Sequence, residues 1–195
     1  MVGTPLKDNS VKPLKDENKL KELYTVLLAQ HPRNALLLRF GLNTLLRIGD
    51  ILEIRYSDVF TDRGNFRDYL RLREEKTQKK KVIMLNNVIR KDLREYCETY
   101  NLTGDDPLFM NFHEPDRPIS RIQAWRILNK CSQILGIEKF GTHSLRKTAA
   151  WRIYDKTKDL VLVQKMLNHC SSKETVRYLG LDQALLDETY QTHTF

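Results

Sequence analysis

The sequence predicts a mainly α-helical protein with one small antiparallel β-sheet, an α+β fold class. Apolar residues recur at helical spacing through most of its 195 residues. Residues 58–85 differ, because short apolar runs there flank a polar tip, which is typical of a hairpin. A hydrophobic content of 41% and a charged content of 30% are ordinary for a soluble globular protein. A chain of this length buries about 70% of its unfolded surface, which is enough for a true core.

The N-terminal part begins with a polar stretch. We expect residues 1–15 to be a flexible lead-in and 16–195 to form one domain. Asp16 is a suitable N-cap for a helix over 17–30, where leucines recur at helical spacing. Pro32 should end this helix, because the residue before a proline avoids the α region.

Two apolar stretches and a change of pattern follow. Residues 35–46 are almost continuously apolar, which predicts a buried helix, broken or frayed near Gly41. A short helix is expected over 49–54. At 58–85 the pattern changes to that of the small sheet, and residues 74–81 form the polar, lysine-rich tip of its hairpin.

The remaining sequence is predicted to be helical, with one long loop over residues 104–118. The helices are expected, in order, over 86–101, 119–135, 143–155, 159–167, 172–178 and 182–191.

The charge of the chain indicates its class of partner. A net charge of +8 and a sequence pI of about 9.4 favour a polyanion, of which nucleic acid is the commonest. The alternative is a soluble protein that happens to be basic, and charge alone barely separates the two.

The cysteines and the apolar runs indicate the compartment. Cys97, Cys131 and Cys170 are widely spaced and odd in number, so neither a disulfide framework nor a structural zinc site is expected. This usage fits a reducing cytosol. No run reaches the length of a membrane span, and the N-terminus has no hydrophobic signal core. We therefore expect a cytoplasmic protein without a membrane partner, a bound metal or a cofactor.

His143 and Arg146 stand three residues apart on a predicted helix, so they share a face. Thr142 before them is a natural N-cap. The start of this helix thus offers backbone N–H groups, an imidazole and a guanidinium on one side, which are the parts of a phosphate cradle. Taken alone, an exposed basic residue beside a capping histidine explains the same pattern.

His169 and Tyr178 are nine residues apart near the C-terminus. A histidine where a helix ends is often a cap that interacts with the helix dipole. A lone tyrosine in a short helix is usually a core residue whose hydroxyl is hydrogen-bonded. Each residue is a weak signal alone, and the ordered set on short helices carries the weight.

Two further cations lie upstream. Arg47 follows an apolar run, where an arginine is costly to bury unless it is paired or faces an anion. Its alternatives are exposure to solvent or a pair with Asp50. Lys76 lies at the hairpin tip, where a solvated basic turn is the simplest explanation.

Four ordered segments resemble those of the tyrosine recombinases, the phage integrase family. Residues 46–58, which begin Leu-Arg-Ile-Gly-Asp, are similar to the first catalytic box, and His143-Ser-Leu-Arg146 resembles the second, His-x-x-Arg box. Leu-Asn-His169 through Tyr178-Leu-Gly resembles the third. Residues 75–85, with Lys76-Thr, resemble the lysine-bearing β-hairpin. The resemblance extends from about residue 13 to the C-terminus and covers one catalytic domain.

The resemblance implies a site and a reaction. The implied catalytic residues are Arg47, Lys76, His143, Arg146, His169 and Tyr178, with Tyr178 as the nucleophile. The reaction would form a covalent 3′-phosphotyrosyl bond to DNA and later rejoin strands, without metal or ATP, during integration or excision of a phage or mobile element. Physical chemistry agrees, because guanidinium groups stabilise charge on phosphate oxygens. His143 would accept the phenol proton, His169 would donate a hydrogen bond, and Lys76 would protonate the departing 5′ oxygen.

The resemblance also implies partners. Double-stranded DNA would be bound through Lys79, Lys80, Lys81 and Arg121, although these lysines could also compete with Lys76 for the acid role. We expect a monomer in free solution and a homotetramer on DNA, with the C-terminal segment from residue 181 docked on a neighbouring protomer.

Two features depart from the family pattern. The helical core-binding domain that usually precedes the catalytic domain has no counterpart here, so we expect an excised domain or a naturally short member. Leu45 stands where a glycine is usual, which changes local backbone freedom but removes no catalytic group.

Two rival functions share parts of this pattern. A type IB topoisomerase uses similar residues and the same covalent chemistry to relax supercoils. A DNA-binding regulator could keep the fold and lose catalysis, although all six catalytic positions hold competent residues.

Overall fold

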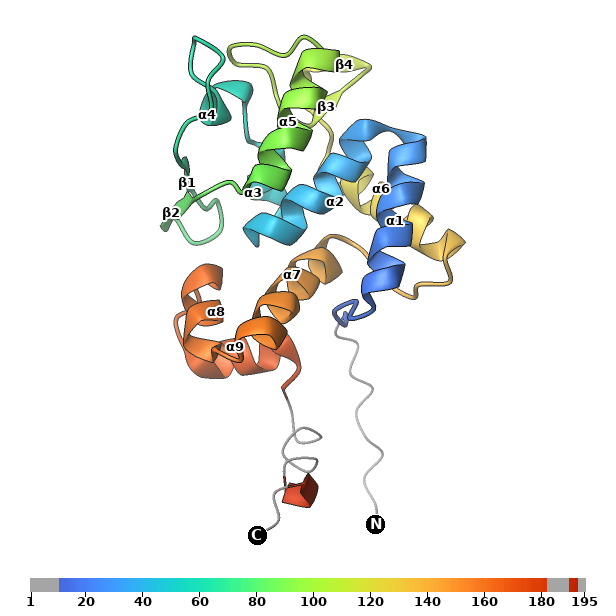
Figure 1. Cartoon of the computed structure of the whole chain (residues 1–195), viewed down its shortest axis with the longest axis vertical. Coiled ribbons are helices and arrows are strands. Elements are labelled where there is room, and N and C mark those ends of the chain that lie inside the picture. Colours follow the sequence, from blue (N-terminus) through green and yellow to red (C-terminus); the bar gives the residue numbers. More distant parts are fainter. Residues whose placement is uncertain (1–10, 182–189, 193–195) are drawn as a thin grey trace.

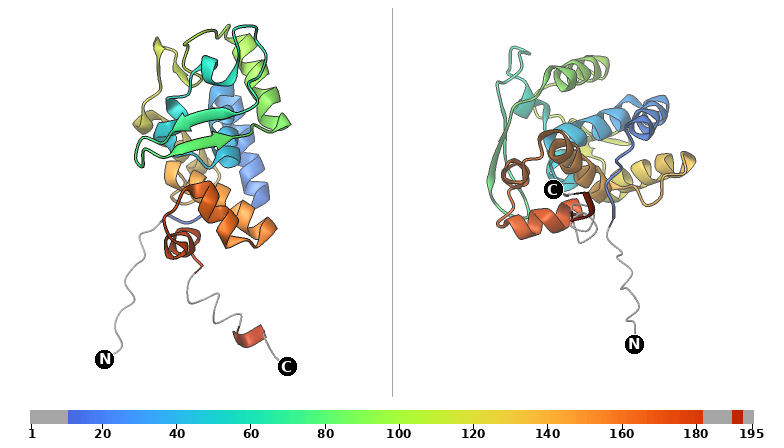
Figure 2. Two further views of the ribbon diagram at one scale, coloured as in Figure 1. Left: turned by 90° about the vertical axis from the view of Figure 1, so that its left-hand side faces the viewer. Right: turned by 60° about the horizontal axis from the view of Figure 1, so that its bottom comes forward.

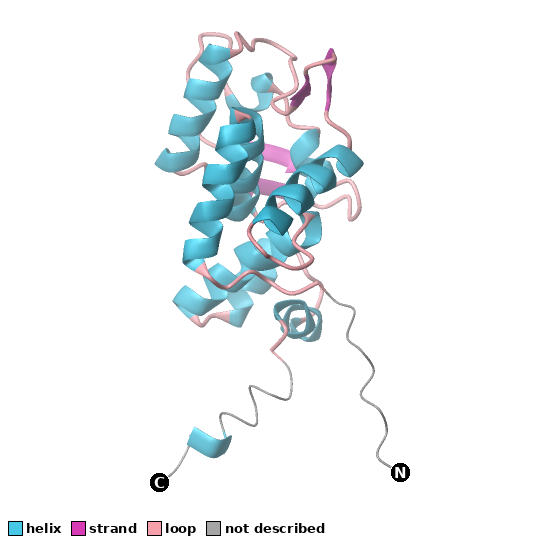
Figure 3. Cartoon of the chain, turned by 90° about the vertical axis from the view of Figure 1, so that its right-hand side faces the viewer, coloured by secondary structure: helices cyan, strands magenta, loops and turns pink. Residues whose placement is uncertain are grey.

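A computed structural model describes residues 11–181 and 190–192, and in these ranges two small sheets lie at the edges of a mainly helical fold, one at the left and one near the top of Figure 1. Strands occupy two separate places, while helices make up most of the molecule (Figure 3). The predicted class, mainly α with a small antiparallel sheet, is confirmed, and the structure has a second such sheet that was not predicted.

The first two helices, α1 (Glu17–Gln30) and α2 (Pro32–Thr44), pack against each other. The carboxylate of Asp16 caps α1 by accepting hydrogen bonds from the amides of Asn18 and Lys19, as predicted. The chain turns at His31, and α2 begins there. The predicted break near Gly41 is wrong, because α2 continues through it. A Cβ at Gly41 would lie 2.5 Å from Leu145 Cδ2, so the glycine allows a later helix to pack closely.

The middle of the chain holds α3 (Ile48–Leu52), α4 (Tyr56–Val59), β1 (Leu70–Arg73) and β2 (Lys80–Ile83). The strands β1 and β2 are antiparallel, with Leu70 opposite Ile83 and Arg73 opposite Lys80. The sheet predicted over 58–85 is therefore confirmed only in part, because its two strands cover no more than residues 70–73 and 80–83. The hairpin crosses in front of the N-terminal helices and ends beside the C-terminal ones (Figure 2).

After α5 (Asn87–Thr99), the chain forms a second two-stranded sheet from β3 (Met110–Asn111) and β4 (Glu114–Pro118). The prediction of a loop over 104–118 is wrong at this place. Every residue of β4 from Glu114 to Arg117 is exposed, and a proline follows Glu114. Such a strand has no buried face, so it lacks the alternation that identifies strands in a sequence.

The last part contains α6 (Arg121–Ile134), α7 (Thr142–Thr157), α8 (Leu160–Leu167) and α9 (Ser172–Leu179). These agree with the predicted helices to within a few residues. The helix predicted over 182–191 lies mostly outside the described residues. No helix in the described ranges is long and apolar enough to cross a bilayer.

Three clusters of buried side chains hold these elements together. One lies between β1, α5 and the β3–β4 region, and a second joins α1, α2 and α6. The third fills the space between α7, α8 and α9 and includes Leu45 from the end of α2. Leu45 thereby fixes the C-terminal helices to the N-terminal half.

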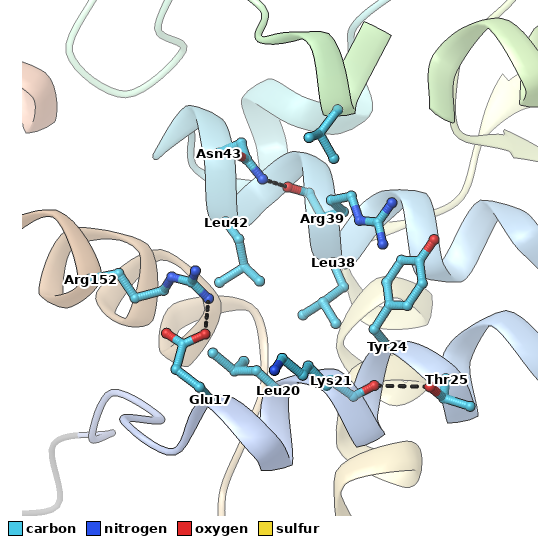
Figure 4. A pocket seen from close by; sticks show the side chains of 11 residues that line it. Glu17, Leu20, Lys21, Tyr24, Thr25, Leu38, Arg39, Leu42, Asn43 and Arg152 are labelled. Atoms are coloured by element: carbon cyan, nitrogen blue, oxygen red, sulfur yellow. Dashed lines mark hydrogen bonds and ion pairs between the residues drawn. The ribbon is translucent and has the colours of Figure 1, made fainter. Parts of the chain in front are cut away.

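Figure 4 shows a pocket between α1, α2 and α7. Leu20, Leu38 and Leu42 are among its apolar lining residues, and an ion pair of 3.0 Å joins Glu17 to Arg152. None of the predicted catalytic residues lines it.

Candidate active site

Arg47 lies in the short connection between α2 and α3. Leu45 ends α2 in the left-handed region, with φ 55° and ψ 21°, and the chain leaves the helix at that point. Arg47 has an extended backbone conformation and is the N-cap residue of α3. Its guanidinium Nη1 lies 3.0 Å from Oε1 of Glu74, and about a quarter of the side chain is exposed.

Arg146 is the most firmly held of the predicted site residues. Its Nε donates to the carbonyl oxygen of Leu45 at 2.7 Å, and Nη2 donates to that of Leu167 at 3.1 Å. The side chain is buried. The guanidinium is therefore fixed between the ends of α2 and α8.

His143 lies one turn before Arg146 on α7 and is exposed. Thr142 was expected to cap this helix, but the N-cap is Gly141. The amide of Gly141 donates to the hydroxyl of Ser144 at 2.9 Å. A Cβ at Gly141 would lie 2.7 Å from Trp125 Cδ1, so only a glycine allows this ring to cover the start of the helix.

His169 follows the left-handed residue Asn168 that ends α8. Its Nδ1 lies 3.0 Å from the Thr175 hydroxyl, and its Nε2 lies 3.6 Å from Oε1 of Glu174. Burial lowers the pKa of His169 despite the opposing effect of Glu174. The neutral imidazole is therefore favoured near pH 7.

Tyr178 lies on α9 with its ring nearly perpendicular to the His169 ring, at a centroid distance of 5.2 Å. Burial raises the pKa of its hydroxyl, and the charges of Arg146 and Arg47 lower it, with a net rise. The phenol is therefore protonated at neutral pH, and an attack by its oxygen requires a proton acceptor.

Lys76 lies in the turn of the β1–β2 hairpin, and the neighbouring residues fix that turn. The amide of Glu75 donates to Oδ1 of Asp50 at 2.9 Å. The ammonium of Lys79 donates to the carbonyl oxygen of Asn168 at 2.9 Å and contacts Cys170 Sγ at 3.3 Å. The turn is therefore held against α3 on one side and against the residues that precede α9 on the other.

The three lysines expected to follow the DNA backbone differ in environment. Side chains alternate between the two faces of a strand, and accordingly Lys80 is exposed while Lys81 is buried. Lys79 reaches the loop before α9. Burial, followed by the charge of Arg146, lowers the pKa of Lys81 to about 8. The position of Lys81 does not fit a contact with DNA phosphates, which needs an exposed ammonium group.

All six predicted catalytic side chains line one pocket. They come from the α2–α3 connection, the hairpin, α7, the α8–α9 loop and α9. Thr142 at the start of α7 lines the same pocket, and so does Arg121 at the start of α6. The arrangement gathers two guanidiniums, an ammonium, two imidazoles and a phenol around one space, as binding and attack of a phosphodiester would require.

Acidic side chains in and below the pocket were not predicted as site residues. Asp50, Glu75 and Glu174 line it, and Glu75 forms an ion pair with Arg121. Glu74 lies beneath the pocket and is fully buried. The alternation Leu70, Leu72, Glu74 was the available signal, because it puts a carboxylate on the inward face of β1.

No group of three or more His, Cys, Asp or Glu side chains within residues 11–181 and 190–192 is placed to hold a metal ion.

The profile of the phage integrase family matches residues 15–184. This chain belongs to the phage integrase family of tyrosine recombinases. It is 36% identical over 181 residues to the probable integrase/recombinase YoeC of Bacillus subtilis (strain 168), covering 93% of this chain and 96% of the relative.

Two further relatives of this tyrosine recombinase domain are longer. Tyrosine recombinase XerD of Chlorobaculum tepidum is 26% identical over 188 residues, which cover 89% of this chain and 60% of the relative. A crystal structure of a lambda integrase tetramer bound to a Holliday junction has a TM-score of 0.69 at 20% identity, covering 88% of this chain and 49% of that one. The recombinase domain thus spans nearly all of YoeC but less than two thirds of the other two.

Proposed function

We propose that this protein cleaves and rejoins DNA as a site-specific recombinase, with Tyr178 as its nucleophile. One observation carries the proposal: six side chains from five segments of the chain line a single pocket. The similarity to an integrase/recombinase over nearly the full chain supports the same reaction class.

The first step would be an attack on a DNA phosphodiester. The phenol oxygen of Tyr178 bonds to phosphorus, the bond from phosphorus to the 5′ oxygen breaks, and a 3′-phosphotyrosyl link remains. Arg47 and Arg146 stabilise the charge on the non-bridging oxygens, because guanidinium groups are always charged and can bind two oxygens at once. His169 donates a further hydrogen bond.

Two protons move in this step. His143 accepts the phenol proton of Tyr178, and Lys76 supplies one to the leaving 5′ oxygen. A 5′ hydroxyl on the same or another strand then attacks the phosphotyrosyl bond and releases the enzyme. The covalent link retains the energy of the phosphodiester, so rejoining needs no ATP.

Strand exchange between two DNA duplexes would involve a homotetramer, with the free protein monomeric. Arg121 lines the pocket, and Lys79 and Lys80 lie on the hairpin that carries Lys76. These three side chains would bind DNA phosphates, and we assign the exchange to integration or excision of a phage or mobile element. The tetrameric lambda integrase complex on a Holliday junction is a relative of the same fold.

Nicked duplexes of randomised sequence test the proposal without knowledge of the natural site. The nick lets the released fragment diffuse away, so the covalent product accumulates. The wild-type protein should form an adduct that resists denaturation, and Tyr178→Phe should form none. Tyr154→Phe on α7 is the matched control and should retain the adduct. An adduct with Tyr178→Phe would refute the assignment, and relaxation of supercoiled plasmid by a monomer would favour a topoisomerase instead.

A further inference from the structure

Glu74 occupies an unusual place for a carboxylate. It follows the last residue of β1 directly, and its amide donates to the carbonyl oxygen of Lys79. Because side chains alternate along a strand, Glu74 faces inward with Leu70 and Leu72. Its side chain is 0% exposed, so the protein itself must neutralise or hydrogen-bond the carboxylate.

The two carboxylate oxygens of Glu74 contact four separate segments. Oε1 lies 3.0 Å from Nη1 of Arg47 and 3.7 Å from Nη2 of Arg146. Oε2 accepts hydrogen bonds from the Thr77 hydroxyl at 2.7 Å and from the Asn168 amide at 3.2 Å. Thr77 follows Lys76 and Asn168 precedes His169, so every one of these contacts is at or next to a predicted catalytic residue.

The protonation state of Glu74 follows from these contacts. Burial alone would raise its pKa, but the hydrogen bonds from Thr77 and Asn168 and the charge of Arg47 lower it overall. Glu74 is therefore ionised at neutral pH. Nη1 of Arg47 and Oε1 of Glu74 have no hydrogen-bond partner among the described residues, so their contact is ionic.

The Glu74 carboxylate balances positive charges that lie close together. Arg47, Arg146 and Lys81 bring three positive groups together, and the two arginines repel each other. Glu74 is fully buried and does not line the pocket that Arg47 and Arg146 line, where a phosphate would bind. It can hold them without occupying the position of the phosphate.

We propose that Glu74 is a positioning residue, whose buried carboxylate holds the Arg47 and Arg146 guanidiniums in the geometry that a phosphodiester needs. The inference rests on the proposed function. Its effect is preorganisation, because donors that are already in place cost no rearrangement when charge develops. A misplacement of about 1 Å can cost about 100-fold in rate.

The variants separate this role from simple stability. Glu74→Gln keeps the size and the hydrogen-bond acceptor but removes the charge. Because it leaves Arg47, Arg146 and Lys81 less compensated, it can destabilise the fold. The double variant, Glu74→Gln with Lys81→Met, removes one negative and one positive charge. It is compared with Lys81→Met alone. Glu53→Gln, at an exposed site after α3, is the matched control for the exchange of residue type.

Adduct formation on the randomised nicked duplexes gives the first readout. At saturating DNA, the double variant should react about 100-fold more slowly than Lys81→Met, with similar melting temperatures and similar DNA affinities. Equal rates for these two proteins would overturn the proposal. A parallel loss of melting temperature, affinity and rate would also overturn it, because it would indicate a merely structural role.

Nitrogen-15 NMR of arginine side chains gives a second readout that needs no DNA. The Nε–H of Arg146 should be protected in the wild type, and Glu74→Gln should speed its hydrogen exchange and that of Arg47. Arg39, which binds Asp92 at 2.7 Å, is an internal reference and should not change. Unchanged exchange at both site arginines would refute positioning. If the wild type forms no adduct, the proposed function fails and this spectrum alone decides the role of Glu74.

Discussion

The carbonyl oxygen of Leu45 accepts a hydrogen bond of 2.7 Å from Nε of Arg146, and Leu45 adopts left-handed backbone angles at this point. In a residue other than glycine, this conformation brings Cβ too close to a backbone carbonyl oxygen, which costs about 1–2 kcal/mol. The Leu45 side chain is fully buried among α7, α8 and α9. One residue thus orients Arg146 through its backbone and joins two halves of the fold through its side chain.

Leu45→Gly should therefore destabilise the protein, although glycine fits the backbone angles better. Loss of a buried leucine side chain costs about 2–5 kcal/mol, and relief of the left-handed strain returns about 1–2 kcal/mol. We expect a net loss of about 2 kcal/mol, and at most about 4 kcal/mol, in the free energy of unfolding, measured by urea denaturation.

Lys139→Gly is the matched control, because Lys139 has φ 51° and an exposed side chain. No buried side chain is lost there, and relief of the strain, about 1–2 kcal/mol, is offset only by the greater freedom of glycine in the unfolded chain, so this variant should be stabilised by up to about 1 kcal/mol. Stabilisation of Leu45→Gly by the same amount would show that the buried side chain contributes nothing.

Most helices and the motif residues could be predicted from the sequence, for local reasons. Apolar spacing located α1, and the carboxylate of Asp16 marked its start. The His143 and Arg146 pair and the later His169 and Tyr178 carry enough chemistry to be noticed without a structure. Their convergence required the resemblance, because nothing local brings residues so far apart in the chain together.

The missed features violate local patterns. Strand β4 is exposed and charged, so it shows no alternation. Glu74 and Lys81 are charged residues on inward-facing positions, where the pattern favours apolar side chains. Their burial depends on Arg47 and Arg146, which arrive from other segments. No composition or spacing within 74–81 distinguishes an inward lysine from an outward one until the strand register is known.

Lys80 should contribute to DNA binding through charge alone. It is exposed on β2, between one lysine that reaches the α8–α9 loop and another that is buried. Affinity falls as salt rises, and loss of one phosphate contact reduces the absolute slope of log affinity against log salt concentration by about 1. We expect that change for Lys80→Gln, measured by fluorescence anisotropy with a labelled duplex over a series of salt concentrations. Lys91→Gln on α5 should leave the slope unchanged, and an equal change there would argue against a specific contact by Lys80.

Lys81 should make stability depend on alkaline pH. Its pKa falls from 10.5 to about 8 on folding, mainly because of burial. Between these values the unfolded chain binds more protons than the folded protein, so stability rises as the pH increases from about 8 to 10.5. The total gain is about 3 kcal/mol.

Lys81→Met should therefore be more stable than the wild type at pH 7, and the difference should disappear above the upper end of this window. Urea denaturation at several pH values measures it. Lys80→Met, an exposed change on the same strand, should follow the wild-type curve. A stability difference for Lys81→Met that does not vary with pH would show that Lys81 does not titrate between those values.

Lys76 is predicted to supply the proton to the leaving 5′ oxygen, and a sulfur substrate isolates that step. A DNA strand with sulfur in place of the bridging 5′ oxygen releases a thiolate, which leaves without a proton because thiols are far more acidic than alcohols. Lys76→Ala should slow adduct formation by about 100- to 10,000-fold on normal DNA, and sulfur should restore most of the rate. The matched variant is Lys79→Ala, since the Lys79 ammonium binds the carbonyl oxygen of Asn168. Rescue of Lys79→Ala but not of Lys76→Ala would transfer the acid role to Lys79.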